Sequence, residues 1–275
     1  MKGYFIFLMG VAGMLIFTGI KSMAQPVPYR GGSMRYQQLV WNDEFNYDGL
    51  PDSSKWNYEN GYIRNHELQY YTTARLQNTF VHKGLLSINA LNDSLQKDGK
   101  VYPITSGSLV TLGKRSWQFG RIEVRAKLPQ ALGTWPAIWM LGQNIKQVGW
   151  PACGEIDIIE HVGYMPDTMH FNAHTKKYNH IKKTGKGSQL YYPQPFNDYH
   201  VYAIEWFKDR IDWYFDDKKV FTFKNEGTGN DSWPFDGPQY LIVNVAFGGA
   251  WGGLKGVEVS TLPQSFLIDY VRVYQ

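Results

Sequence analysis

Apolar and polar residues alternate with a period of two in several short runs along the chain. The clearest runs are RIEVRAKL at Arg121–Leu128, HVYAIEWF at His200–Phe207, RIDWYFD at Arg210–Asp216 and FLIDYVRVY at Phe266–Tyr274. Gly, Pro, Asn and Asp punctuate the chain around them, as expected where strands turn back on one another. The pattern predicts an all-β fold in which antiparallel strands form one sandwich.

The chain shows no long amphipathic helical pattern, no repeat of fixed period and no Pro/Ser-rich linker, so we expect residues 25–275 to form a single domain. One segment interrupts the alternation with lysines and glycines, HTKKYNHIKKTGKGSQ at His174–Gln189. It is interpreted as a long surface loop. Such a loop is either a solvated basic segment or a rim that touches a ligand.

The first 24 residues are typical of a secretory signal peptide. Lys2 precedes an apolar run, and Ser22-Met23-Ala24 provides the small residues of a cleavage site near Ala24. The alternative is an uncleaved membrane anchor, but four glycines in this stretch weaken it. We therefore expect a secreted or periplasmic protein that has no membrane contact after cleavage.

Charge and cysteine content narrow the classes of partner and fold. Lys2 and Lys21 leave with the signal peptide, so 28 − 2 = 26 basic residues face 24 acidic ones and the net charge is +2. This balance does not favour a polyanion, so nucleic acid is not an expected partner. Cys153 is the single cysteine and excludes an intramolecular disulfide, so stability must come from packing. We expect a monomer with one sizeable core.

The stretch GEIDIIEHVG at Gly154–Gly163 contains three carboxylates within six residues. In a regular strand Glu155 and Asp157 share one face, and Glu160 lies on the other. A β-bulge between Asp157 and Glu160 adds one residue and returns Glu160 to the face of Glu155. Carboxylates on one strand face repel one another and do not help folding, so their presence indicates a functional groove. We therefore predict the bulge that places all three on the same face.

Two carboxylates that face one bond are the chemistry of glycoside hydrolysis. A separation of about 5–5.5 Å implies a covalent intermediate and retained configuration. Trp135, Trp139 and Trp150 just upstream support this hypothesis, because sugar rings stack on indoles. Two alternatives remain open on these residues alone: a solvated acidic face on an edge strand, and a calcium site.

The chain resembles the glycoside hydrolases of family 16, and within them the bacterial laminarinase-like endo-β-1,3-glucanases. The family motif E-[ILV]-D-[ILV]-x-E stands here as EIDIIE, with GTWPAIWML at Gly133–Leu141, LVWNDEF at Leu39–Phe45, RNHELQYYT at Arg64–Thr72 and IDYVRVYQ at the C-terminus. The resemblance runs from about Leu39 to Gln275. It implies a concanavalin-like β-jelly roll whose two antiparallel sheets form an open concave cleft.

By this resemblance Glu155 is the nucleophile, Glu160 the general acid/base and Asp157 the carboxylate between them, and catalysis needs no cofactor. The expected substrate is a β-glucan cleaved at internal β-1,3 bonds, and many similar enzymes also accept β-1,3-1,4 glucan. Agarases, porphyranases and carrageenases share the bulged motif, so a galactan hydrolase is one alternative. A non-catalytic carbohydrate-binding jelly roll is the other, but a binding module needs no paired acids.

The resemblance also implies cleft residues and a metal site. The substrate-binding candidates are Arg64, Asn65, Trp135, Trp139, His174 and Trp251. Arg64 is alternatively half of a structural pair with Glu67, and His170 is more simply a residue satisfied within the fold. One structural calcium ion away from the cleft is expected at Glu44, Gly84 and Asp269, unless Asp269 only forms a salt bridge.

Overall fold

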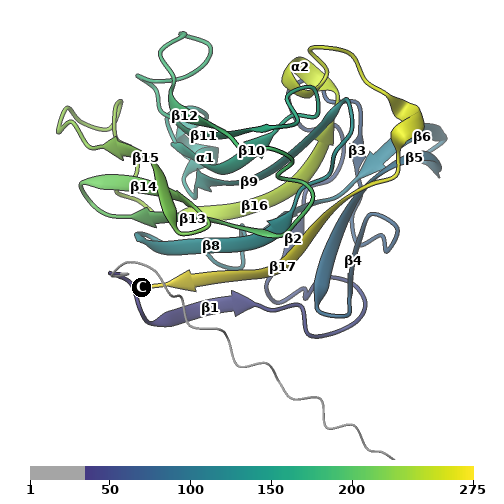
Figure 1. Cartoon of the computed structure of the whole chain (residues 1–275), viewed down its shortest axis with the longest axis horizontal. Coiled ribbons are helices and arrows are strands. Elements are labelled where there is room, and N and C mark those ends of the chain that lie inside the picture. Colours follow the sequence, from purple (N-terminus) through teal and green to yellow (C-terminus); the bar gives the residue numbers. More distant parts are fainter. Residues whose placement is uncertain (1–34) are drawn as a thin grey trace, which may run out of the picture. The chain divides into compact units, whose positions relative to one another are not determined.

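The computed structural model describes residues 35–275, so the predicted signal peptide lies outside the described residues. In this part of the chain the helices are single turns, namely α1 (Ile145–Val148), α2 (Gly249–Gly252) and the 3-10 helix η1 (Val259–Thr261). None of the helices within residues 35–275 has the length and apolar character needed to cross a bilayer. The remaining regular structure is β-strand, as the alternation predicts (Figure 1).

One sheet has ten strands in the order β15-β14-β13-β8-β17-β5-β6-β3, with β1 beside β17 and β4 beside β5. Its pairs are antiparallel except for the parallel pair β3 and β6. The strands are β1 (Leu39–Asp43), β3 (Tyr70–Tyr71), β4 (Thr79–His82), β5 (Leu85–Lys97), β6 (Lys100–Ser106), β8 (Gly120–Lys127), β13 (His200–Trp206), β14 (Arg210–Phe215), β15 (Lys218–Lys224) and β17 (Gln264–Tyr274).

The other sheet has seven antiparallel strands in the order β12-β11-β10-β9-β16-β7-β2. The strands are β2 (Asn57–Tyr58), β7 (Ser108–Val110), β9 (Thr134–Gly142), β10 (Glu155–His161), β11 (Thr168–His174), β12 (Lys186–Tyr191) and β16 (Gln239–Phe247). The motif GEIDIIEHVG thus supplies β10, near the middle of this sheet.

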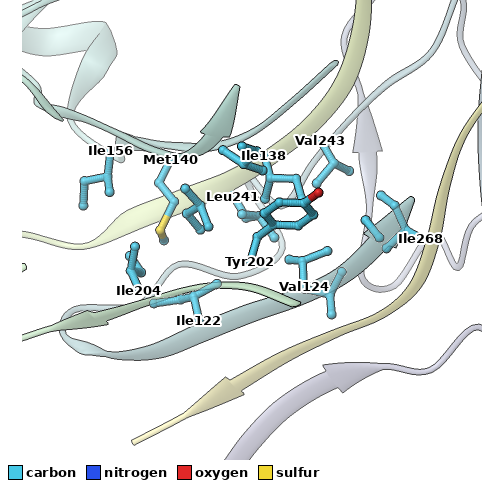
Figure 2. Close-up of a cluster of buried hydrophobic side chains, with 14 of the residues drawn as sticks. Ile122, Val124, Ile138, Met140, Ile156, Tyr202, Ile204, Leu241, Val243 and Ile268 are labelled. Carbon is cyan, nitrogen blue, oxygen red and sulfur yellow. The ribbon is translucent and has the colours of Figure 1, made fainter. Parts of the chain in front are cut away.

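Strand alternation builds the core between the two sheets. Figure 2 shows side chains of β9, β10 and β16 meeting those of β8, β13 and β17, among them Met140, Leu241 and Tyr202. On β9 the inward residues Ile138 and Met140 are fully buried. The residues between them therefore point to the opposite face of the seven-stranded sheet. We call this outer face the cleft face.

The four alternating runs become β8, β13, β14 and β17, which confirms those predictions. The predicted loop at His174–Gln189 is too long, because β11 ends at His174 and β12 begins at Lys186. The start of β12 lacks a strand signal because Ser188, its first partly buried residue, is polar, so no apolar and polar residues alternate there. Leu190 packs against the core, whereas Gly187, Gln189 and Tyr191 are exposed.

Candidate active site

A β-bulge in β10 brings the predicted carboxylates together. On the neighbouring strand β11, Asp157 is opposite Asn172 and Glu160 is opposite His170, so Ile158 and Ile159 oppose one residue. The register with β9 shifts at the same place. Both isoleucines are fully buried in the core between the sheets. Two successive inward side chains reverse the parity of the strand, which confirms the predicted bulge.

Indole N–H groups hold both glutamates on the cleft face. Trp150 Nε1 donates to Glu155 Oε2 at 2.8 Å, and Trp135 Nε1 donates to Glu160 Oε1 at 3.0 Å. The other oxygen of Glu160 accepts a hydrogen bond from Asn172 Nδ2 at 3.1 Å. Trp135 and Trp150 thus fix the rotamers of the two carboxylates, and their role as sugar platforms stays a prediction.

His174 lies between the first two carboxylates. Its Nε2 is 3.7 Å from Glu155 Oε1 and 3.3 Å from Asp157 Oδ2. Asp157 is 1% exposed, and its Oδ2 has no hydrogen-bond donor with favourable geometry. Glu155, Asp157 and His174 together have the donor set of a small cation site. Two of these groups are the expected nucleophile and its neighbour, so we expect acid–base chemistry from the cluster.

Burial and mutual repulsion raise the pKa of all three carboxyl groups. Desolvation is the largest cause for each, and the pKa values of Glu155 and Asp157 are raised the most. The charge on Asp157 further raises the pKa of Glu155, and the charge on Glu160 raises that of Asp157. The indole donors and His174 oppose these shifts at Glu155 and Glu160. The cluster therefore keeps protons to a higher pH than isolated carboxyls do.

These shifts predict that Asp157→Asn stabilises the fold at neutral pH. A carboxyl whose pKa is raised by folding favours the folded state below its ordinary pKa, and loses that contribution as pH rises through the raised value. An uncharged amide at this position escapes the loss. We expect thermal unfolding at pH 7 to report a gain of roughly 1–2 kcal/mol, a usual size for relieving a strained functional site.

The pH dependence separates this effect from a general change in packing. The gain from Asp157→Asn should shrink towards zero as pH falls below about 4, the ordinary range of an aspartate. The exposed Asp198 gives a control, because Asp198→Asn should leave the transition unchanged at every pH. An Asp157→Asn protein that unfolds earlier than the parent at pH 7 would contradict the electrostatic interpretation.

Arg64 covers one of the predicted platforms. Its guanidinium lies 4.9 Å from the ring centroid of Trp139, which is 8% exposed and donates its indole N–H to Asn244 Oδ1 at 2.8 Å. Arg64 forms its ion pair with Glu59, and not with Glu67 as the structural alternative supposed. Trp139 is therefore on the cleft face beneath Arg64, and a sugar over this position would meet the guanidinium first.

The remaining substrate candidates, Asn65 and Trp251, both lie at α2, where Ala250 N donates to the main-chain carbonyl of Asn65 at 2.8 Å. Asn65 adopts a positive φ of 56° and donates to Glu67 Oε1 at 3.2 Å. Trp251, on α2, lies edge to face against Trp135 with ring centroids 5.3 Å apart. It also contacts His170 at 4.8 Å, and burial lowers the pKa of that imidazole to about 4. Trp251 thus stands beside the indole that holds Glu160, while the substrate roles stay predictions.

Sequence reasoning missed two side chains at the site. Asn172 contacts Glu160 and lies two residues before His174 on the same strand, so the period of two could have identified it. His180 comes from the loop between β11 and β12, and its ring centroid lies 5.2 Å from Trp150 and 5.4 Å from His174. No periodicity places a loop residue, and Lys176 to Lys183 offered no other signal.

Of the predicted calcium ligands Glu44, Gly84 and Asp269, the two carboxylates are already paired with arginines. Glu44 accepts hydrogen bonds from Arg272 Nε and Nη2, both at 2.8 Å, and Asp269 Oδ2 accepts one from Arg125 Nη1 at 2.5 Å. These guanidinium groups neutralise the carboxylates, so the arrangement does not fit a divalent cation well. Calcium stays a prediction, and comparing thermal unfolding with calcium and with a chelator would test it.

Comparisons with known proteins agree with this geometry. The family model described as glycosyl hydrolases family 16 matches residues 55–272. A β-glucanase from Rhodothermus marinus is 48% identical over 90% of this chain and 88% of its own length.

Two solved structures have the same fold. The laminarinase from Rhodothermus marinus superposes with a TM-score of 0.82 at 47% identity, covering 86% of this chain and 97% of its own. SCLam, a non-specific endo-β-1,3(4)-glucanase, has a TM-score of 0.83 at 44% identity, covering 90% and 94%.

Proposed function

The chain belongs to glycosyl hydrolase family 16, and we propose that it is a retaining endo-β-glucanase that hydrolyses internal β-1,3-glucosidic bonds. The observation that carries the proposal is the bulge in β10, which sets Glu155 and Glu160 on one face of the sheet. A carbohydrate-binding module has no use for two acids whose pKa values are raised at the cost of stability. The binding alternative is therefore less supported.

In the proposed mechanism a glycosyl-enzyme forms and is then hydrolysed. A carboxylate oxygen of Glu155 attacks the anomeric carbon, while Glu160 gives its proton to the glycosidic oxygen and the leaving sugar departs as an alcohol. Glu160, now ionised, takes a proton from water as that water attacks the anomeric carbon. The bond to Glu155 breaks, and both carboxyl groups return to their starting protonation.

We assign the roles of Glu155 and Glu160 by their positions in the family motif, because both glutamates accept N–H hydrogen bonds and these bonds do not distinguish them. Trp150 donates to Glu155, and an N–H donor stabilises the anion that must attack. Asp157 is buried between the two glutamates, and its charge disfavours a second and third ionisation in the cluster. Burial, the largest cause of the raised pKa of Glu160, favours the protonated form that a general acid needs.

We infer the substrate from the two similar proteins of known structure. The two solved structures are described as a laminarinase and a non-specific endo-β-1,3(4)-glucanase, so we infer that β-1,3 bonds are the main target and that mixed-linkage β-1,3-1,4 glucan is also cleaved. The near-neutral charge of the mature chain gives no advantage for sulfated galactan. The galactan alternative is less supported.

Export and oligomeric state are also proposals. The N-terminal sequence supports cleavage near Ala24 and release to the periplasm or the medium, where a polymeric glucan is accessible. We further propose that the enzyme acts as a monomer, because its candidate site is built from elements of one chain.

Reducing-sugar release from laminarin, lichenan, agarose and carrageenan, measured side by side, tests the function. We expect the highest rate on laminarin and a measurable rate on lichenan, with early products several sugars long because internal bonds are cut. Release from a galactan alone would overturn the substrate assignment.

A further inference from the structure

We propose that Trp213, on the ten-stranded sheet, is a positioning residue that locks the catalytic bulge from behind. Its indole Nε1 donates a hydrogen bond of 2.8 Å to the main-chain carbonyl of Asp157. Trp213 lies on β14 and Asp157 on β10, so the bond crosses the core from one sheet to the other (Figure 1). The catalytic consequence rests on the proposed function, whereas the structural contact does not.

The contact falls where the strand is irregular. Asp157 is the last residue of β10 in regular register before the shift on both sides, towards β9 and towards β11. A bulge disrupts the hydrogen-bond ladder locally, so a donor from outside the sheet is especially effective there. Trp213 supplies that donor at Asp157. After this residue the alternation of side chains reverses, which places Glu160 on the cleft face.

Trp213 is well placed to hold this position. Its side chain is fully buried and packs against Phe221 of the next strand, with ring centroids 5.0 Å apart. The hydrogen bond lies in the interior, where water cannot replace a lost donor without entering the core. Removing the N–H therefore leaves the Asp157 carbonyl to find another partner by rotating its peptide, and that rotation moves the residues on either side of the bulge.

Burial alone does not require such a bond in this sheet. Trp206, on the adjacent strand β13, is also fully buried, and its indole Nε1 has no hydrogen-bond partner. The two tryptophans match in residue type, burial and sheet, and differ in whether the indole N–H donates a hydrogen bond to the catalytic strand. Trp206 thus provides a matched control for the loss of an indole from the core.

The experiment compares Trp213→Phe with Trp206→Phe by steady-state kinetics on laminarin and by hydrogen exchange of the β10 amides. Both substitutions remove comparable volume, and only the first removes a bond to the bulge. We expect Trp213→Phe to lower kcat about tenfold with KM within about twofold, because misaligned catalytic groups affect the transition state more than binding. We also expect faster exchange at Ile158, Ile159 and Glu160 in this variant alone.

A second variant addresses the case in which Trp213→Phe does not fold. Benzothienylalanine at position 213 replaces the indole N–H with sulfur at nearly constant shape, so it removes the donor without creating a cavity. The same fall in kcat and the same local exchange are expected. Equal kinetics and exchange in the Trp213 and Trp206 variants would overturn the proposal, as would faster exchange with an unchanged kcat. If the parent protein shows no glucanase activity, the exchange comparison still tests the lock by itself.

Discussion

Glu155→Ala is expected to reduce glucan hydrolysis by on the order of 10⁴-fold or more while the protein remains folded. The carboxylate that attacks the anomeric carbon is removed, and no other described side chain occupies its place beside Trp150. Loss of a covalent nucleophile usually removes most of the rate enhancement of an enzyme. Folding should survive, because the substitution also removes a buried charge with a raised pKa.

Added azide gives this variant a chemical signature. The small anion fits the space that the Glu155 side chain vacates and attacks the same face of the sugar, so a single displacement yields a glycosyl azide of inverted configuration. An activated aryl glycoside as substrate makes the product measurable by NMR. The exposed Glu258 serves as a control, because Glu258→Ala should retain the parent rate. Parent-like hydrolysis by Glu155→Ala would show that the roles are wrongly assigned.

Glu160→Gln is expected to separate the two steps of the reaction. The amide keeps the shape of the side chain, and its single oxygen can accept a hydrogen bond from Trp135 or from Asn172 but not from both. It cannot give a proton to the leaving sugar. General acid–base catalysis contributes about 10²–10⁴-fold, so activity on laminarin should fall within that range. A dinitrophenyl glycoside, whose leaving group needs no proton, should still react in the first step and leave a glycosyl-enzyme detectable by mass spectrometry.

The pH dependence of kcat/KM tests the role of the same residue. The pKa of Glu160 is raised, so the protonated acid persists at low pH and is lost as pH rises through the raised value. In the parent enzyme kcat/KM should therefore decline on the basic side of its optimum. The decline should be absent in Glu160→Gln.

Added azide gives the Glu160→Gln variant its own signature, because azide attacks the glycosyl-enzyme in place of water and needs no general base. The product should have retained configuration, and an inverted product would contradict the assignment.

The sequence predicts those features of the site that depend only on neighbouring residues in the chain. The parity of EIDIIE requires a bulge to bring its two glutamates together, and the structure places two isoleucines inward at that point. The alternating runs identify β8, β13, β14 and β17 for the same reason. In both cases the information lies within about ten neighbouring residues, which is the length over which strand geometry repeats.

The sequence does not predict contacts made between elements that are distant in the chain. Trp213 and Asp157 are 56 residues apart and meet only because the two sheets stack. The ion pair of Arg64 with Glu59 and its position over Trp139 depend on how a loop crosses the sheet. His180 reaches the site from a loop whose lysines gave only a solvent signal. Each of these contacts depends on the tertiary structure, which the periodicity of the sequence does not predict.

The cross-core bond from Trp213 to Asp157 bears on how such enzymes can be recombined. A chimera can take β10 from one parent and β14 from another. Such a chimera keeps the two glutamates but can lose the hydrogen bond from the residue at position 213 to the carbonyl at position 157. Chimeras with a crossover point between positions 157 and 213 should then be soluble but have a lower kcat. Libraries that keep these two segments from a common parent should retain more turnover at equal sequence divergence.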